Sequence, residues 1–519
     1  LLRETSVAGP GFINLALSDE ALAVQANRLA EDPRSGLVPV TRPLRVLVDF
    51  AGPNVAKPMH VGHLRATVIG DSLQRIARAL GHQVTSDAHF GDWGLQIGLL
   101  IISLEDEQPD LPYFRSDYND SMFVEEPPVT MEDLDRMYPA ASARMKEDVG
   151  YRDRARKATA ELQKGRPGYL ALHKHFWKVS KFALEREFTA LNIHFDLWKG
   201  ESDVNYLIEE LVAQARESGV AVPSEGALVI QVSRDEDKKE IPPLLLVSSE
   251  GSAMYGTTDL ATIVEREREV KPDLFLYVVD QRQAMHFVQV FRAAQAAGWS
   301  QESRLEHIGF GTMNGTDGKP FKTRSGGVIK LHDLITSCRE RAMEKMEAGG
   351  YGKELSPEER EKTALMVGTA ALKFADLSNY RLTDYVFDLD RFTSFEGKTG
   401  PYLQFQGVRV KSLLRKAAEQ GYQEAPIQVI LPEEKALVLA LDGFNGAVQM
   451  AFEKRAPHFV AEHVFSLAQA FSTFWVASPK VLEEKDEAVR GSRLRLARAV
   501  LVQLELGLGL LGIEIPERM

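Results

Sequence analysis

Hydrophobic and polar positions in the first half of the chain follow the order expected of an α/β fold. Residues 46–50 form a short apolar run, typical of a buried strand. A loop containing glycine and proline leads from it into a long helical pattern over residues 60–80, closed by Gly81. A second strand is predicted over residues 83–89. Because helices separate some of the later apolar runs, we expect a doubly wound parallel sheet. Its further strands are predicted at 227–232, 244–248, 274–279 and 306–310.

The pattern divides the chain into three parts. Residues 1–43, with a strand at 12–17 and a helix at 18–30, are expected to be the remnant of an N-terminal domain and a linker. Residues 44–356 are predicted to form a Rossmann-like catalytic domain, with an insertion over about residues 103–190. Residues 357–519 show helical periods alone and predict an all-α bundle. Its helices are expected at 361–377, 401–420, 433–454, 459–476 and 487–508.

The composition is that of a soluble globular protein. Of 519 residues, 44% are hydrophobic and 26% are charged, which excludes a mainly disordered chain. Because no run of 18 or more residues is apolar, no membrane span is expected. The single cysteine, Cys338, excludes a disulfide framework and a thiolate metal cluster. With no signal-peptide pattern, a cytoplasmic location is expected.

The net charge of −12 is concentrated in one segment. Residues 103–139 hold eleven acids and two bases, so this stretch carries −9 and the rest of the chain −3. A nearly neutral body can still have local basic surfaces, so a nucleic-acid partner is not excluded.

Two histidines at the start of the predicted helix 60–80 carry the strongest chemical signal. His60 and His63 are three residues apart, so they share one face of the first turn, where backbone N–H groups are free. Gly62 leaves the space between the rings open, and Lys57 precedes them. Together these groups predict an anion cradle suited to ATP, whose α-phosphate gains charge in a transition state. The alternatives are a chance match and a metal pair. A metal pair needs a third ligand that is not apparent, so no metal site, zinc included, is expected.

A second, weaker signal is a glycine-rich basic loop over residues 317–327. It contains Lys319, Lys322 and Arg324, and it follows the last predicted strand of the sheet. Such loops can close on phosphates, although a solvated loop tip is the ordinary interpretation.

These two segments resemble the paired signatures of class I aminoacyl-tRNA synthetases. Residues 53–65 resemble the arginyl-tRNA synthetases in particular, as do residues 91–96, 200–202, 255–259 and 402–404. The resemblance extends over about residues 10–519. It departs from the family where the second signature reads Lys-Pro-Phe-Lys-Thr-Arg, with Thr323 in place of the second lysine, and Lys57 is thought to compensate. A full N-terminal domain, which in relatives touches the tRNA elbow, is also missing.

The resemblance implies an arginine–tRNA ligase that forms arginyl-adenylate from arginine and ATP and then charges the terminal ribose of tRNA(Arg). It implies Mg²⁺ accompanying ATP, a monomer, and in most relatives an activation step that requires bound tRNA. The residues implied to act in catalysis and ATP binding are Lys57, His60, Gly62, His63, Lys319 and Lys322. Those implied to bind arginine are Asp49, Asn54, His60, Glu201, Tyr255, Asp259 and Gln283. Those expected to contact tRNA are Tyr402, Gln404, Arg409, Lys411, Arg415 and Arg493.

Two of the residues that the resemblance assigns to arginine are also spaced compatibly with a guanidinium ligand, although taken alone an Asp–Tyr pair is usually structural and Asp259 could cap a helix. A guanidinium group needs planar acceptors and carboxylates, and Tyr255 and Asp259 are four residues apart, on one face of a helix start. Three alternatives remain at this stage. A small nucleotidylyltransferase is disfavoured by the long helical domain, and another class I specificity by Tyr255, Asp259 and Glu201. A non-catalytic RNA-binding relative is disfavoured by the intact cradle.

Overall fold

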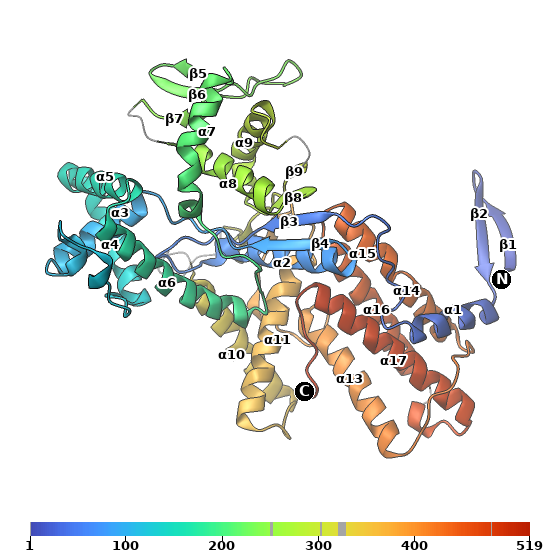
Figure 1. Ribbon diagram of the computed structural model, residues 1–519. Helices are drawn as coiled ribbons and strands as arrows, with labels where there is room; N and C mark the ends of the chain where they lie inside the picture. Colours follow the sequence, from blue (N-terminus) through green and yellow to red (C-terminus); the bar gives the residue numbers. More distant parts are fainter. Residues whose placement is uncertain (1, 250–252, 301–303, 320–328, 479) are drawn as a thin grey trace.

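A four-stranded parallel sheet lies at the centre of the computed structural model, which describes residues 2–249, 253–300, 304–319, 329–478 and 480–519 (Figure 1). Its strands stand in the spatial order β4-β3-β8-β9. The chain thus runs from β3 to one neighbour, β4, and later returns to the other side of β3 as β8. These strands are β3 (Arg45–Asp49), β4 (Gln83–Asp87), β8 (Leu274–Tyr277) and β9 (Arg304–His307).

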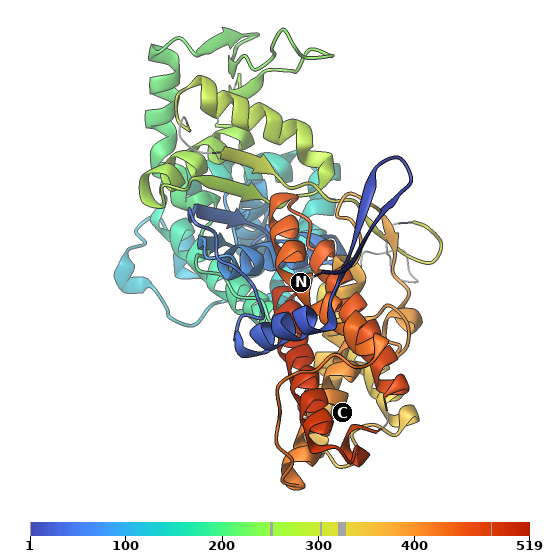
Figure 2. The same ribbon diagram turned by 90° about the vertical axis from the view of Figure 1, so that its right-hand side faces the viewer.

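The remaining strands form three small sheets. A hairpin of β1 (Leu2–Ala8) and β2 (Phe12–Leu17) extends from the first helix, away from the body of the molecule (Figures 1 and 2). An antiparallel sheet consists of β5 (Ala221–Ser224), β6 (Ala227–Ile230) and β7 (Leu244–Val247). Finally, β10 (Met313–Asn314) pairs in parallel with β11 (Tyr385–Val386).

Helices make up most of the rest of the described chain. The first nine are α1 (Asp19–Glu31), α2 (Val61–Ala79), α3 (Leu95–Glu107), α4 (Met131–Glu147), α5 (Val149–Gln163), α6 (Pro167–Ala190), α7 (Asn205–Glu217), α8 (Tyr255–Glu269) and α9 (Ala284–Ala296). They are followed by α10 (Leu331–Gly349), α11 (Pro357–Leu377), α12 (Leu389–Phe392), α13 (Gly400–Glu419), α14 (Pro432–Asp442), α15 (Phe444–Glu453), α16 (His458–Ala477) and α17 (Glu487–Leu510). Short 3₁₀ turns are η1 (Pro112–Phe114), η2 (Asp120–Met122), η3 (Glu201–Val204), η4 (Gln281–Gln283) and η5 (Val481–Glu483).

The predicted fold class, a parallel α/β sheet followed by a helical bundle, is confirmed. Two of the strands expected in the parallel sheet belong elsewhere, because β6 and β7 pair antiparallel with each other in a separate sheet. Short apolar runs between turns do not reveal which neighbour they pair with, so the pattern alone could not separate the two sheets. The helix expected over residues 433–454 is two helices, α14 and α15, separated at Gly443.

Alternation along β3 fixes which helices cover each face of the parallel sheet. Val46 and Val48 belong to the large core that includes α2. Leu47 points to the other face, into a cluster shared with α8 and α9. Because successive strand residues point to opposite faces, one five-residue strand is sufficient to attach helices on both sides.

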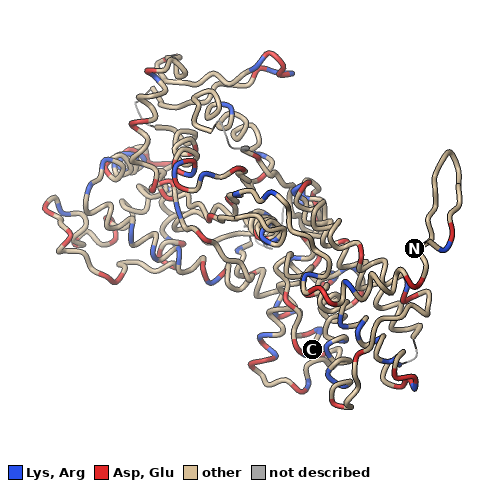
Figure 3. Tube along the Cα trace, turned by 45° about the vertical axis from the view of Figure 1, so that its right-hand side comes forward, with Lys and Arg blue, Asp and Glu red and all other residues tan. Residues whose placement is uncertain are grey.

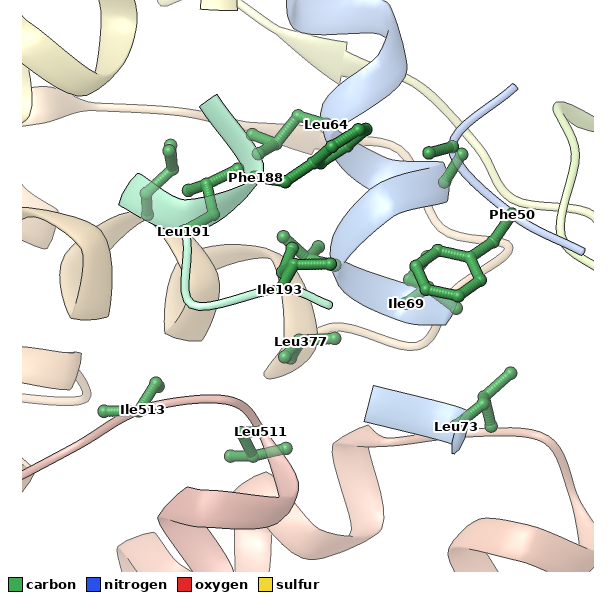
Figure 4. Close-up of a cluster of buried hydrophobic side chains, with 14 of the residues drawn as sticks. Phe50, Leu64, Ile69, Leu73, Phe188, Leu191, Ile193, Leu377, Leu511 and Ile513 are labelled. Carbon is green, nitrogen blue, oxygen red and sulfur yellow. The ribbon is translucent and has the colours of Figure 1, made fainter. Parts of the chain in front are cut away.

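The main core continues without a break from α2 into the helical domain. Figure 4 shows Leu64, Ile69 and Leu73 of α2 beside Leu377 at the end of α11 and, below, Leu511 and Ile513 from the segment after α17. The end of α6 also contributes to this cluster. The helix that begins with the two histidines is therefore packed against three distant parts of the sequence.

Buried ion pairs reinforce this packing. Arg65 of α2 contacts Asp376 of α11 at 2.9 Å, with side chains 2% and 0% exposed. Deeper in the same helix, Asp71 contacts Arg75 at 2.9 Å and Lys373 of α11 at 3.6 Å, and the Lys373 ammonium donates to the carbonyl of Gly512. A buried ion is stable only when its partners stay in place, so these pairs fix the position of α2 along its axis.

Within the described residues, no helix is long and apolar enough to cross a membrane.

Removal of Asp376 tests how much the helical domain holds α2. We expect Asp376→Ala to lower the free energy of unfolding by about 3–5 kcal/mol, because Arg65 would stay buried without its carboxylate. Urea titration followed by tryptophan fluorescence would measure the change. The double variant Arg65→Met/Asp376→Leu should recover much of the loss. A double variant as unstable as Asp376→Ala would show that packing, not the unpaired charge, causes the defect.

Candidate active site

A cavity of about 310 Å³ opens at the carboxyl ends of β3 and β8. This is where the strand order reverses, which is the usual place for a ligand in an open α/β sheet. Asp49 ends β3, Tyr277 ends β8, and both line the cavity. The wall also includes, from the residues predicted by sequence, Asn54, His60, Gly62, His63, Glu201, Tyr255, Asp259 and Gln283.

The two histidines form a compact pair at the start of α2. His60 is the N-cap residue, and its Nδ1 accepts a hydrogen bond from the backbone N–H of Gly62 at 3.0 Å. Nδ1 of His63 accepts from the backbone N–H of His60 at 3.1 Å, and the ring centroids are 4.0 Å apart. A Cβ atom at Gly62 would lie 2.8 Å from the His60 ring, so only glycine permits this arrangement.

These hydrogen bonds determine which nitrogen of each imidazole can donate to a ligand. Burial lowers the pKa of His63 to about 3, and the nearby charges of His60 and Lys57 act in the same direction. Burial and Lys57 also lower the pKa of His60. Both rings are thus neutral near pH 7. Because Nδ1 of each ring is an acceptor, its proton must be on Nε2. The pair therefore offers two neutral N–H donors.

The three predicted lysines are placed differently. The Lys57 ammonium lies over the ring of Tyr138, 4.3 Å from its centroid, and is not part of the cavity wall. Lys319 is exposed, and its backbone N–H donates to the Asp317 carboxylate. Lys322 lies outside the described residues.

Acidic groups also line the cavity. Asp259 is on the first turns of α8, four residues after Tyr255, and its carboxylate contacts Nε2 of His286 at 2.6 Å. Burial raises the pKa of the Glu201 carboxyl to about 7, with repulsion from Asp92 and Asp259 adding to the shift. This end of the cavity can accept a cation that donates several hydrogen bonds.

Asp49 belongs to a buried charge network beneath the cavity. Arg266 of α8 lies between Asp49 and Asp87, 2.7 Å from a carboxylate oxygen of each. His89 is 3.5 Å from Asp87 and also lines the cavity. Burial disfavours the ionised form of Asp87, but His89 and Arg266 outweigh it and hold the pKa of Asp87 below its usual range. Asp49 is therefore already paired with an internal cation.

Sequence reasoning missed His89, Arg266 and His286. Arg266 follows Asp259 by seven residues, so helical spacing from Tyr255 was the signal that could have found it. His286 follows Gln283 by three residues at the start of α9. No motif identifies His89, which follows the end of β4.

In the helical domain, the structure contradicts part of the predicted tRNA surface. Gln404 is fully buried and donates to the carbonyls of Met366 and Glu514, so it cannot reach a nucleic acid. Arg493 is 4% exposed and paired with Glu434 and Glu484 at 2.9 and 3.0 Å. The other three arginines of α17 also face acids or backbone oxygens. Arg490 contacts Glu484, Arg495 contacts Glu31, and Arg498 contacts Glu424.

Lys411 is also neutralised, because it contacts Glu505 at 3.1 Å and Glu517 at 2.6 Å. Figure 3 shows acidic residues interspersed with the basic ones along the helices around the C-terminus.

Arg409 lines a second cavity, of about 730 Å³, together with Phe405, Lys416 and Trp475. Its guanidinium group is 4.9 Å from the ring centroid of Phe405 and 5.4 Å from that of Trp475. Tyr402 and Arg415 are partly exposed on the same helix, α13.

Comparison with known proteins agrees with this architecture. Residues 27–389 match the family model described as "tRNA synthetases class I (R), catalytic domain", and residues 403–519 match the "DALR anticodon binding domain". An arginine–tRNA ligase of Maricaulis maris (strain MCS10) is 57% identical over 513 residues, covering 99% of this chain and 87% of the relative.

Solved structures show the same fold. The arginyl-tRNA synthetase of Thermus thermophilus superposes with a TM-score of 0.80 at 26% identity, covering 100% of this chain and 89% of that one. The Plasmodium falciparum enzyme gives a TM-score of 0.82 at 24% identity, covering 100% and 86%. The catalytic match spans more than half of the chain, and the full-length relatives are close in sequence. The chain belongs to the arginyl-tRNA synthetase family of class I aminoacyl-tRNA synthetases.

Proposed function

We propose that this arginine–tRNA ligase activates arginine with ATP in the cavity between β3 and β8. A carboxylate oxygen of arginine attacks the α-phosphorus of ATP, the bond to the β-phosphate oxygen breaks, and pyrophosphate leaves. The terminal ribose hydroxyl of tRNA(Arg) then attacks the carbonyl carbon, and AMP leaves. The observation that carries the proposal is the placement of an imidazole pair and an acidic cluster in the wall of one cavity.

The imidazole pair is assigned to the phosphates. Two Nε2–H donors can bind phosphate oxygens, and the positive end of the α2 helix dipole adds to the attraction for an anion. Because no side chain becomes covalently bound, acceleration comes from positioning and from stabilising the charge that grows on the α-phosphate. Neutral donors serve this purpose across the physiological pH range, since neither imidazole titrates near pH 7. Lys57, Lys319 and Lys322 are proposed to bind the outer phosphates, where Mg²⁺ accompanies ATP.

The acidic end is assigned to the arginine side chain. Asp259 and Glu201 can accept hydrogen bonds from the guanidinium group, and Tyr255 stands beside them at the mouth of the cavity. Asn54, Gln283 and His60 are proposed to hold the amino and carboxylate groups of the substrate. Asp49 is already paired with Arg266, and we assign to it a contact with the substrate amino group through its remaining acceptor capacity.

The cavity lined by Arg409, Lys416 and Trp475 is proposed to contact the tRNA. It combines cations with aromatic faces, the combination that binds unstacked bases and the phosphates between them. Tyr402 and Arg415 on the same helix are proposed to extend this surface.

ATP–pyrophosphate exchange across the twenty amino acids tests the function directly. We expect exchange with arginine alone, and only when tRNA(Arg) is present, because the RNA end is proposed to complete the site. Arginine-dependent exchange without tRNA would support the specificity for arginine and exclude the requirement for tRNA. No exchange with any amino acid, with or without tRNA, would contradict the proposal.

Substitution of Asp259 tests the recognition of the guanidinium group. Asp259→Asn should raise the KM for arginine by about 10²-fold or more, because a desolvated charge pair is lost. The KM for ATP should change little. Asp273→Asn is the matched control, since Asp273 forms an exposed pair with Arg45 at the opposite end of the sheet strands. A normal KM for arginine in Asp259→Asn would show that another acid binds the side chain.

The raised pKa of Glu201 predicts a pH dependence of arginine binding. Glu201 titrates at about 7 in the empty site, and a guanidinium cation binds better to the ionised form, so binding should release a proton. The KM for arginine should therefore rise as pH falls below about 7. In Glu201→Gln the pH dependence of the KM for arginine should be reduced. An unchanged profile in this variant would show that another group causes it.

A further inference from the structure

We call the acidic stretch of residues 103–139 the acidic insert; it includes the first half of helix α4, which contacts residues near the histidine pair. Asp135 and Tyr138 are three residues apart and so share a face of this helix. The Tyr138 ring lies under the ammonium of Lys57, which is 4.3 Å from the ring centroid. The Asp135 carboxylate contacts the ammonium of Lys330 at 2.5 Å. One face of α4 therefore contacts two lysines from segments that are far apart in the sequence.

Both lysines belong to the backbone that carries the histidine pair. Lys57 precedes His60 by three residues, and Lys330 pairs with His60 in an antiparallel bridge. Around this bridge, the N–H of Val61 donates to the carbonyl of Ile329 at 3.0 Å, and the N–H of Leu331 donates to the carbonyl of Met59 at 2.9 Å. A shift of α4 would therefore be transmitted to the first turn of α2.

The helix α4 is itself firmly anchored. A capping box between Thr130 and Asp133 fixes its N-terminus. Arg136, on another face, binds Glu107 of α3 with two hydrogen bonds of 2.8 Å. Leu134 and Met137 are buried against the rest of the insert. A helix fixed in this way can hold a flexible lysine side chain in one place.

An aromatic ring is a suitable holder for a lysine that must later bind phosphate. A carboxylate would neutralise the ammonium and compete with ATP, whereas a ring face attracts the cation only weakly and leaves its charge available. The polyphosphate of ATP carries several negative charges and can draw Lys57 from the ring. Lys330 has the opposite requirement, because its pairing with Asp135 fixes backbone next to His60.

We propose that α4 of the acidic insert is a positioning element for ATP, in which Tyr138 holds Lys57 ready for the phosphates and Asp135 fixes the Lys330 backbone beside His60. The inference rests on the proposed function, since it assigns Lys57 and His60 to ATP. It gives the insert a role in the first chemical step.

Steady-state ATP–pyrophosphate exchange with arginine and tRNA(Arg) tests this role in the full chain. Tyr138→Leu should raise the KM for ATP or lower kcat by about three- to tenfold, the range expected when a partly buried cation–π contact is lost. In this variant the KM for arginine should stay within about twofold of the wild-type value, because Tyr138 contacts Lys57, which is not assigned to arginine. Tyr138→Phe, which keeps the ring, should restore wild-type behaviour. Asp135→Asn should also affect ATP parameters.

The matched control is Asp117→Asn, which breaks an exposed pair with Arg115 in the same insert. It should leave every parameter unchanged. Wild-type ATP parameters in both Tyr138→Leu and Asp135→Asn would overturn the positioning role while leaving the ligase function intact. Equal defects in Tyr138→Leu and Tyr138→Phe, or a parallel change in the KM for arginine in Tyr138→Leu, would also overturn it. If Tyr138→Leu lowers the thermal midpoint of unfolding, the kinetic parameters of Asp135→Asn decide whether α4 has the positioning role. Absence of exchange in the wild-type chain would overturn the proposed function and this inference together.

Discussion

The charges buried along α2 are the constraint on which the rest of the structure depends. Arg65 and Asp71 would be very costly in a protein interior without partners. Asp376 and Lys373 of α11 pair with them, and Lys373 in turn donates to the carbonyl of Gly512 after α17. The helix consequently has one favourable position along its axis. That position puts its N-terminus, with His60 and His63, at the carboxyl ends of β3 and β8, so the helical domain contributes to the geometry of the cavity without touching it.

Local patterns predicted the elements of the fold well, because helix ends depend on nearby residues. The histidine helix, the strand before it and the helices after residue 357 were found close to their observed bounds. The pairing of strands was harder to predict from the sequence, as the separate sheet of β6 and β7 shows. Arg493 shows the same limit for the prediction of surface residues. It was expected to be exposed and to contact tRNA, but its partner Glu434 is 59 positions away, and no local signal reveals such a pair. For the candidate site, most of the predicted residues that the structure describes line the cavity, but His89 on its wall and the partners Arg266 and His286 were not predicted.

Charge is controlled differently in the two groups of side chains that line the cavity. At the proposed phosphate site the histidines are neutral, so these donors add no positive charge that would hold pyrophosphate after it forms. At the proposed arginine site the carboxylates have partners or a raised pKa. Asp259 contacts His286, Asp49 is paired with Arg266, and the pKa of Glu201 is raised. The site thus avoids a cluster of unpaired anions before the cationic substrate arrives.

The contacts that close around α2 also set an order for folding. Ser72 of α2 donates to the carbonyl of Leu510, 438 positions later, and Lys373 donates to Gly512. During synthesis on the ribosome, α2 and the parallel sheet emerge long before these residues exist. The helix α2 therefore cannot complete its packing, and Asp71 and Ser72 stay hydrated, until the segment after α17 docks beside it. Contacts of such long sequence separation form slowly, so the histidine pair reaches its final place among the last events of folding.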